Sequence, residues 1–162
     1  MGRNLISMRF DPFRPFRNAI FLVGLIFCFS SMQGTSPNND MDKDILYYVN
    51  VDRKSIGLKP LELNSFESSV AAEHSRNMAS GKTPFGHKGM DARIKKIGKE
   101  LGALSQAGEN VAVGQMTARE VVQGWLNSPG HKRNIEGDFT LTGIGYATDK
   151  AGATYFTEIF TK

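Results

Sequence analysis

From residue 42 to residue 126 the apolar positions recur mainly at intervals of three and four residues, the spacing of amphipathic helices. Four helices are expected there. One begins at Asn64 with Glu67 three residues later, and another at Thr117 with Glu120 three residues later, both in the pattern of a capping box. The four apolar faces are Ile45, Leu46, Val49 and Ile56; Phe66, Val70, Ala71, His74 and Met78; Met90, Ile94, Ile97 and Leu101; Val121, Val122, Trp125 and Leu126.

The C-terminal residues follow a different pattern. Residues 141–146 and 154–160 are rich in β-branched and aromatic side chains, and the sequence Asp-Lys-Ala-Gly at 149–152 separates them. This pattern is typical of an antiparallel hairpin. Helices first and strands last predict an α+β domain in which helices cover an antiparallel sheet.

The first 34 residues carry four arginines and one aspartate, followed by an unbroken apolar run at residues 19–29. The run is shorter than the roughly 20 residues that cross a bilayer, and it has the length of a signal-peptide core. We therefore expect a signal peptide or an uncleaved membrane anchor over residues 1–34, a linker over 35–41 and one folded domain over 42–162.

Cys28 is the only cysteine and lies inside this leader, so the folded domain forms no internal disulfide. Among exported domains this is more typical of a bacterial product than of an animal or plant one. The residues before Cys28 match a lipoprotein signal only loosely, so lipidation of Cys28 is the less favoured alternative. An extracellular or cell-envelope location is expected.

The charge distribution argues against nucleic acid as a partner. The net charge is +4, but most of the excess comes from the arginines of the leader, and the remaining chain is nearly neutral. A protein that neutralises several phosphates carries its basic residues on the folded surface. We expect a monomer that contacts a membrane only through its leader.

Histidines are the main candidates for chemistry, because phosphate loops, dinucleotide-binding turns, nucleophile elbows and zinc-protease helices do not occur in the sequence. His74 falls on an apolar helix face and is expected in the core. His87 and His131 lie in glycine-containing segments expected to be loops, where binding groups often collect. Glu109 lies in a third such segment. Two histidines and a carboxylate can hold Zn²⁺ or another divalent cation, but the spacing does not establish that they meet.

Six motifs, in this order over nearly the whole domain, resemble the CAP superfamily, also called SCP/PR-1-like, in its disulfide-free bacterial branch. They are Ala71-Ala72-x-His74-Ser75-x-x-Met78-Ala79, Phe85-Gly86-His87, Gly108-Glu109-Asn110-Val111-Ala112, Trp125-Leu126-Asn127-Ser128-Pro129-Gly130-His131-x-x-Asn134-Ile135, Thr142-Gly143-Ile144-Gly145-Tyr146 and Tyr155-Phe156-Thr157-Glu158-Ile159-Phe160.

The resemblance implies an α-β-α sandwich with a central antiparallel sheet and a large cleft lined by two histidines and two acids. By motif, the histidines are His87 and His131, the first acid is Glu109, and Asn110 also lines the cleft. Ser128 stands in the cleft where animal and plant members carry the second acid. At position 158, a glutamate replaces the glutamine usual in relatives, which suggests polarity within the sheet or at the cleft edge.

The resemblance leaves three functions open, because the family is linked to metal binding, to lipid or sterol binding and to disputed proteolysis. The first is a binding domain for a small molecule, lipid or peptide, with His87 and His131 as metal ligands. The second is a hydrolase that uses His87, Glu109 and His131. The third is a non-catalytic interaction protein of the envelope. The missing second carboxylate favours the first and leaves enzymatic activity undecided.

Overall fold

The structure is a computed structural model of the 162-residue chain, and it describes residues 40–162. The expected leader, Cys28 and most of the expected linker lie outside the described residues. The first helix begins one residue before the predicted domain start. In chain order the described elements are α1 (Met41–Ser55), β1 (Glu62–Leu63), α2 (Ser65–Ala79), α3 (Met90–Leu101), β2 (Ala107–Val113), α4 (Ala118–Leu126), α5 (Pro129–Ile135), β3 (Leu141–Thr148) and β4 (Thr154–Thr161).

The strands form one sheet in the order β1-β3-β4-β2. β4 pairs antiparallel with both β3 and β2, which confirms the predicted hairpin. The short strand β1 instead pairs with β3 in parallel, with Glu62 opposite Leu141. The sheet is therefore antiparallel except at this edge, and β2 forms the other edge.

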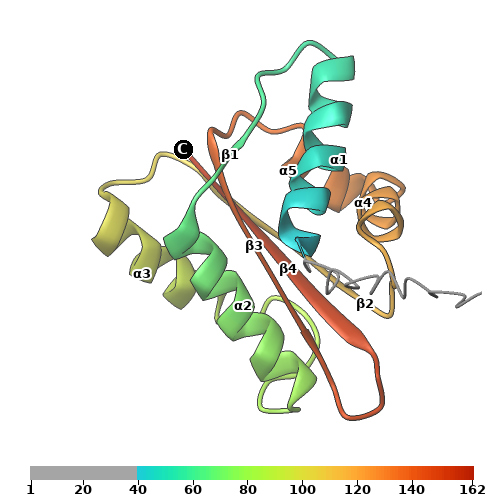
Figure 1. The fold of residues 1–162 in the computed structure, drawn as a ribbon. Coiled ribbons are helices and arrows are strands. Elements are labelled where there is room, and N and C mark those ends of the chain that lie inside the picture. Colours follow the sequence, from blue (N-terminus) through green and yellow to red (C-terminus); the bar gives the residue numbers. More distant parts are fainter. Residues whose placement is uncertain (1–39) are drawn as a thin grey trace, which may run out of the picture. The chain divides into compact units, whose positions relative to one another are not determined.

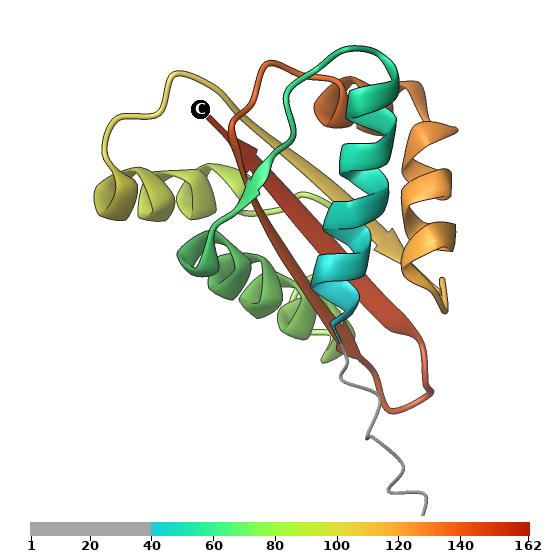
Figure 2. The ribbon, with the colours of Figure 1, turned by 45° about the horizontal axis from the view of Figure 1, so that its top comes forward.

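Helices cover both faces of the sheet (Figures 1 and 2), with α2 and α3 on one side and α1, α4 and α5 on the other. On the α2 side, Ile159 of β4 packs with Val70 and Ala71. On the opposite side, Phe156 and Phe160 belong to a larger apolar cluster that includes residues of α1 and α4. The predicted α-β-α sandwich is confirmed.

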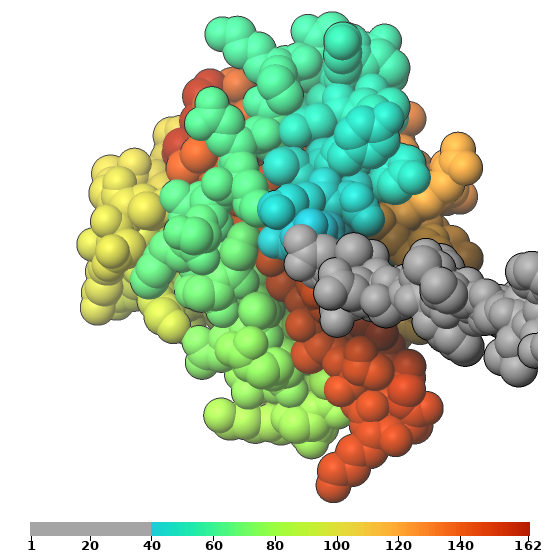
Figure 3. All heavy atoms as spheres, in the orientation of Figure 1, coloured from blue at the N-terminus to red at the C-terminus, as the bar shows by residue number. Residues whose placement is uncertain are grey.

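The end of the β3–β4 hairpin extends beyond the helices at the lower right of Figure 3. Local hydrogen bonds stabilise its turn, because Oδ1 of Asp149 accepts from the backbone N–H groups of Ala151 (2.8 Å) and Ala153 (2.9 Å). Aspartate side chains commonly bond to backbone groups within turns. The chain therefore reverses here through turn chemistry rather than through packing.

Two helix starts follow the predicted capping pattern to different extents. Thr117 and Glu120 form a complete capping box at α4. Asn64 caps α2 by accepting from two backbone N–H groups. Glu67 does not complete a box there, so that half of the prediction is wrong. Its side chain is buried between α2 and the sheet, where Oε1 accepts a hydrogen bond from the Thr161 hydroxyl at 2.5 Å.

Two local predictions fail where the apolar pattern carries little information. Ile56, assigned to the apolar face of the first helix, is 50% exposed because α1 ends at Ser55. The short helix α5 was expected to be a loop after Ser128. Pro129 instead occupies its first turn, where a missing N–H costs no helical hydrogen bond.

Two glycines allow α2 to lie directly on β3. A Cβ atom on Gly145 would lie 2.1 Å from the backbone nitrogen of Ala72, and one on Gly143 would lie 2.2 Å from the backbone carbon of Glu67. Ser75 of α2 also donates a hydrogen bond to the Gly145 carbonyl at 3.0 Å. These contacts fix α2, and the loop that follows it, against the sheet.

Candidate functional site

The edge strand β2 carries the centre of the candidate site. Successive side chains of a strand point to opposite faces of the sheet. Glu109 pairs in register with Ile159 and therefore faces α2 and α3, whereas Asn110 pairs with Glu158 and faces α5. One edge of the sheet thus presents neighbouring residues to both helical layers.

The Glu109 side chain has no exposed surface and is bound by Arg93 of α3. Nε of Arg93 donates to Oε2 at 2.7 Å, and Nη2 donates to Oε1 at 2.7 Å. Such two-pronged pairs between a guanidinium and a carboxylate are among the strong hydrogen-bonded contacts of proteins. Both carboxylate oxygens are therefore held, and their charge is matched.

His87 lies in the loop between α2 and α3, as expected, with its side chain 47% exposed. Its Nδ1 lies 3.0 Å from Oε1 of Glu109. A carboxylate can only accept hydrogen bonds, so Nδ1 carries the hydrogen in this contact. In the neutral ring Nε2 then keeps its lone pair, and none of residues 40–162 forms a hydrogen bond with it.

His74 fixes the loop that carries His87. It is buried on α2, which confirms the prediction of a core histidine, and its Nε2 lies 2.9 Å from the carbonyl oxygen of Gly86. Burial is the main cause that lowers the His74 pKa, so the ring is neutral near pH 7. Gly86 has a φ of 133°, which glycine adopts without strain.

His131 lies in the first turn of α5 rather than in a loop. Its carbonyl oxygen accepts from Nδ2 of Asn110 at 3.2 Å, and Asn110 Oδ1 accepts from Asn134 at 2.8 Å. These amides hold α5 against β2. Burial and, to a smaller extent, the nearby His87 lower the His131 pKa, which favours a neutral ring.

The rings of His87 and His131 lie beside one another, with centroids 6.4 Å apart and planes inclined by 53°. They come from opposite layers of the sandwich and meet near the edge of β2. The structure therefore brings His87, Glu109 and His131 together. Asn110 is fully buried behind them and contacts the backbone of His131.

Ser128 supplies no carboxylate at the position of the second acid. It is the residue immediately before α5, is partly exposed, and forms no side-chain capping bond with the helix. The acidic group that the motifs bring to this site is therefore Glu109 alone, and Arg93 already binds it.

Arg93 and Asn134 contribute to the site but were not identified from the sequence as site residues. A signal for Arg93 exists, because it lies three residues after Met90 and four before Ile97, within the apolar stripe of α3. A charged residue in such a stripe usually has a buried partner. Asn134 is a position of one of the six motifs, but residue type and spacing do not reveal its partners, Glu109 and Asn110, because they depend on tertiary packing.

The donor set fits a divalent cation in part. Imidazoles are common zinc ligands, and a histidine whose second nitrogen bonds to a carboxylate is typical of metal sites. In the part of the chain that the structure describes, no group of three or more His, Cys, Asp or Glu residues is arranged to hold a metal ion. The site thus offers two imidazoles and one carboxylate, and Arg93 already binds the carboxylate.

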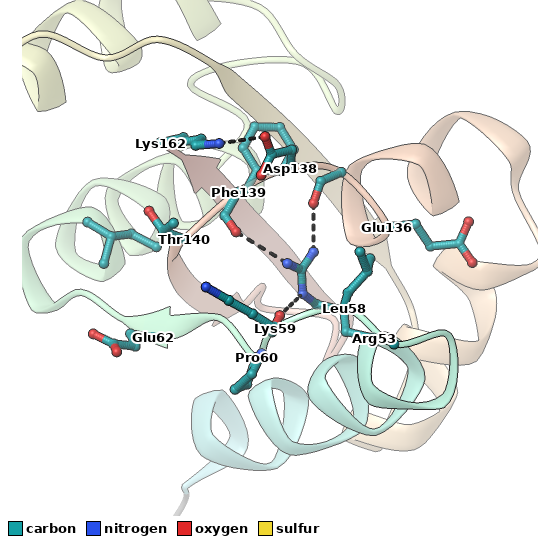
Figure 4. A pocket seen from close by; sticks show the side chains of 13 residues that line it. Arg53, Leu58, Lys59, Pro60, Glu62, Glu136, Asp138, Phe139, Thr140 and Lys162 are labelled. Carbon is teal, nitrogen blue, oxygen red and sulfur yellow. Dashed lines mark hydrogen bonds and ion pairs between the residues drawn. The ribbon is translucent and has the colours of Figure 1, made fainter.

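A hollow of about 840 Å³ lies away from this site, beside β1 and the start of β3 (Figure 4). Neither His87 nor His131 lines it. Arg53 in its wall is only 2% exposed. Its guanidinium donates at 2.7–3.2 Å to the backbone carbonyl oxygens of Lys59, Ile135, Gly137 and Phe139. Arg53 therefore acts as a structural residue that stabilises the connection from α5 to β3.

Comparison with known proteins identifies the family. Residues 46–160 match the model of the family described as "CAP: Cysteine-rich secretory protein family". The chain belongs to this family. With Cys28 as its one cysteine, this CAP protein has no internal disulfide, in agreement with the sequence analysis.

Bacterial relatives resemble this CAP protein in sequence and fold. The uncharacterized protein YkwD of Bacillus subtilis (strain 168) is 37% identical over 108 residues, which make up 65% of this chain and 42% of YkwD. An outer surface protein of Borrelia burgdorferi is 26% identical with a TM-score of 0.65, over 76% of this chain and 93% of that one. An extracellular SCP-domain protein of Bacillus anthracis str. Ames is 26% identical with a TM-score of 0.61, over 74% and 39%. The chain thus spans less than half of YkwD.

The descriptions of the structural relatives bear on location. One is an outer surface protein and the other an extracellular protein, which agrees with an extracellular or envelope location for this chain. Among residues 40–162, no helix combines the length and apolar character needed to cross a membrane.

Proposed function

We propose that this CAP protein is an extracellular or envelope-associated binding domain whose ligand site is built on His87 and His131. In this proposal the two imidazoles hold Zn²⁺ or another divalent cation. The remaining positions on the cation accept a small molecule, a lipid or a peptide. A bound cation would supply a positive centre that attracts electron-rich groups of the ligand.

The pair of imidazoles is the observation that carries the proposal. The two rings lie 6.4 Å apart, and neither Nε2 of His87 nor the ring nitrogens of His131 bond to any described residue. Metal ligation needs neutral imidazoles, because a protonated nitrogen has no lone pair to donate. The contact with Glu109 orients His87 so that its free nitrogen is the one further from the carboxylate.

A hydrolase that uses His87, Glu109 and His131 is the second candidate. A general base must reach the proton that it removes. The Glu109 side chain has no exposed surface, both of its oxygens bond to Arg93, and Ser128 replaces the second acid. These features support binding better than acid–base catalysis.

Calorimetry with Zn²⁺ tests the proposal. The wild-type domain is expected to bind one ion, and the His87→Ala, His131→Ala double variant to lose this binding. Lys88→Ala is the matched control, because it removes an exposed side chain from the same loop and is expected to bind as the wild type does. Equal zinc affinity in the wild type and the double variant would exclude the histidine site.

A substrate screen separates the two candidates. The wild-type domain is expected to hydrolyse no member of a broad set of peptides and esters, with or without Zn²⁺. Turnover that His87→Ala abolishes would favour the hydrolase. Absence of both turnover and histidine-dependent zinc binding in the wild type would leave the third candidate, a non-catalytic interaction protein of the envelope.

A further inference from the structure

We propose that Arg93 is a positioning residue of the histidine site: it holds Glu109 so that the carboxylate orients His87 instead of ligating a bound cation. This inference rests on the proposed function, in which His87 and His131 are the ligands. It assigns to Arg93 a role that neither the motifs of the sequence nor the match to the family provides.

Arg93 is placed to fix both the carboxylate and the loop. Its side chain is only 13% exposed. Two of its nitrogens donate to the two oxygens of Glu109, and the third, Nη1, donates to the carbonyl oxygen of Lys88 at 3.0 Å. Lys88 directly follows His87. One guanidinium therefore connects α3, the edge strand and the backbone beside the histidine.

The geometry determines which ring nitrogen of His87 is free. With Arg93 present, Glu109 accepts from Nδ1 of His87, so the neutral ring carries its hydrogen on Nδ1 and its lone pair on Nε2. Without Arg93, the carboxylate of Glu109 would lose the two hydrogen bonds that fix its oxygens, and among the described residues only His87 would still bond to it. The carboxylate would then no longer be held beside Nδ1, and the hydrogen of the neutral His87 ring would no longer be fixed on that nitrogen.

A second ion pair on α3 provides the comparison. Lys96 contacts Glu73 at 3.0 Å, but both side chains are more than half exposed, and this pair shares no hydrogen bond with Glu109 or with a histidine. Exposed pairs of this kind contribute little to stability and orient little around them. Lys96→Met therefore removes a cation from the same helix without disturbing Glu109.

The ¹⁵N chemical shifts of the His87 ring, recorded on metal-free protein, test the proposal directly. The wild type is expected to carry hydrogen on Nδ1. Arg93→Met is expected to lose this preference and to show the hydrogen on both nitrogens, while the control Lys96→Met retains the wild-type pattern. Hydrogen on Nε2 in the wild type would overturn the proposal even if Arg93→Met fails to fold.

Zinc affinity gives a second readout. Loss of a residue that orients a metal-binding histidine typically weakens affinity by about 10- to 100-fold, and this loss is expected for Arg93→Met but not for Lys96→Met. Unchanged shifts and affinity in folded Arg93→Met would overturn the proposal. If the wild type binds no zinc, the proposed function fails, whereas the shifts still test the role of Arg93.

Discussion

Glu158 is a buried acid. Among the described residues, no cationic side chain forms a hydrogen bond with it. It lies fully buried on β4, facing the α1, α4 and α5 side of the sheet. Oε1 lies 3.2 Å from the Thr142 hydroxyl, and Oε2 forms no hydrogen bond with the described residues. Burial raises its pKa from 4.5 to about 8, against smaller opposite effects of Thr142 and Arg53. The side chain is therefore mostly neutral at pH 7, where it resembles a glutamine.

The contribution of Glu158 to the free energy of unfolding is expected to fall as the pH rises from about 4.5 to about 8. In this range the unfolded chain has lost the Glu158 proton that the folded protein keeps, so stability decreases by up to about 1.4 kcal/mol per pH unit and then levels off. Denaturant unfolding across this range should show a shallower slope for Glu158→Gln than for the wild type. Glu73→Gln, at an exposed position, is the control. An identical slope in Glu158→Gln would contradict this account.

At the scale of elements, the sequence predicts the helices and strands whose signals lie in residues adjacent in the chain. The capping box at Thr117 and the β3–β4 hairpin, with its β-branched and aromatic strands around a turn, were predictable from neighbouring residues. β2 and α5 were not, because β2 is buried on both faces over most of its length and α5 buries only Ile135. The contact between α2 and β3 could not be predicted either, since the space left by Gly145 appears only once the helix is docked.

Gly145→Ala is expected to destabilise the protein strongly. The new Cβ would lie 2.1 Å from the backbone of Ala72, so the helix must move away from the strand, at a cost of about 3 kcal/mol or more. Gly98→Ala is the matched control. Gly98 lies within α3, and its new Cβ would meet only the Leu104 side chain, at 3.8 Å. Because alanine favours a helix more than glycine does, this substitution should stabilise the protein by about 0.5–1 kcal/mol. Thermal unfolding of both variants checks this, and similar stability in the two would refute the close contact.

The edge of β2 is protected against pairing with another strand. The carbonyl oxygen of Glu109 accepts from Asn134 at 3.1 Å, and that of Val111 accepts from the Trp125 indole at 3.1 Å. These carbonyls are therefore not available as hydrogen-bond acceptors for an added strand. A ligand at this edge would contact side chains rather than extend the sheet.

At the scale of the whole molecule, the sandwich unites parts of the site that are distant in sequence. His87 and Glu109 could be named as candidates from residue type and motif. That they meet His131 depends on β2 being the edge strand, on Asn110 holding α5, and on α2 fixing the loop of His87. None of these relations is encoded in local spacing. The family resemblance therefore predicts that the three residues converge, whereas residue type and spacing alone do not.

A crystal structure of the zinc-soaked protein, with anomalous scattering recorded at the zinc edge, tests the central claim most directly. The account predicts one zinc ion between His87 and His131, bound through Nε2 of His87, with Glu109 still paired to Arg93. Zinc at other residues only, or zinc bound directly by Glu109 after the Arg93 contact breaks, would contradict it.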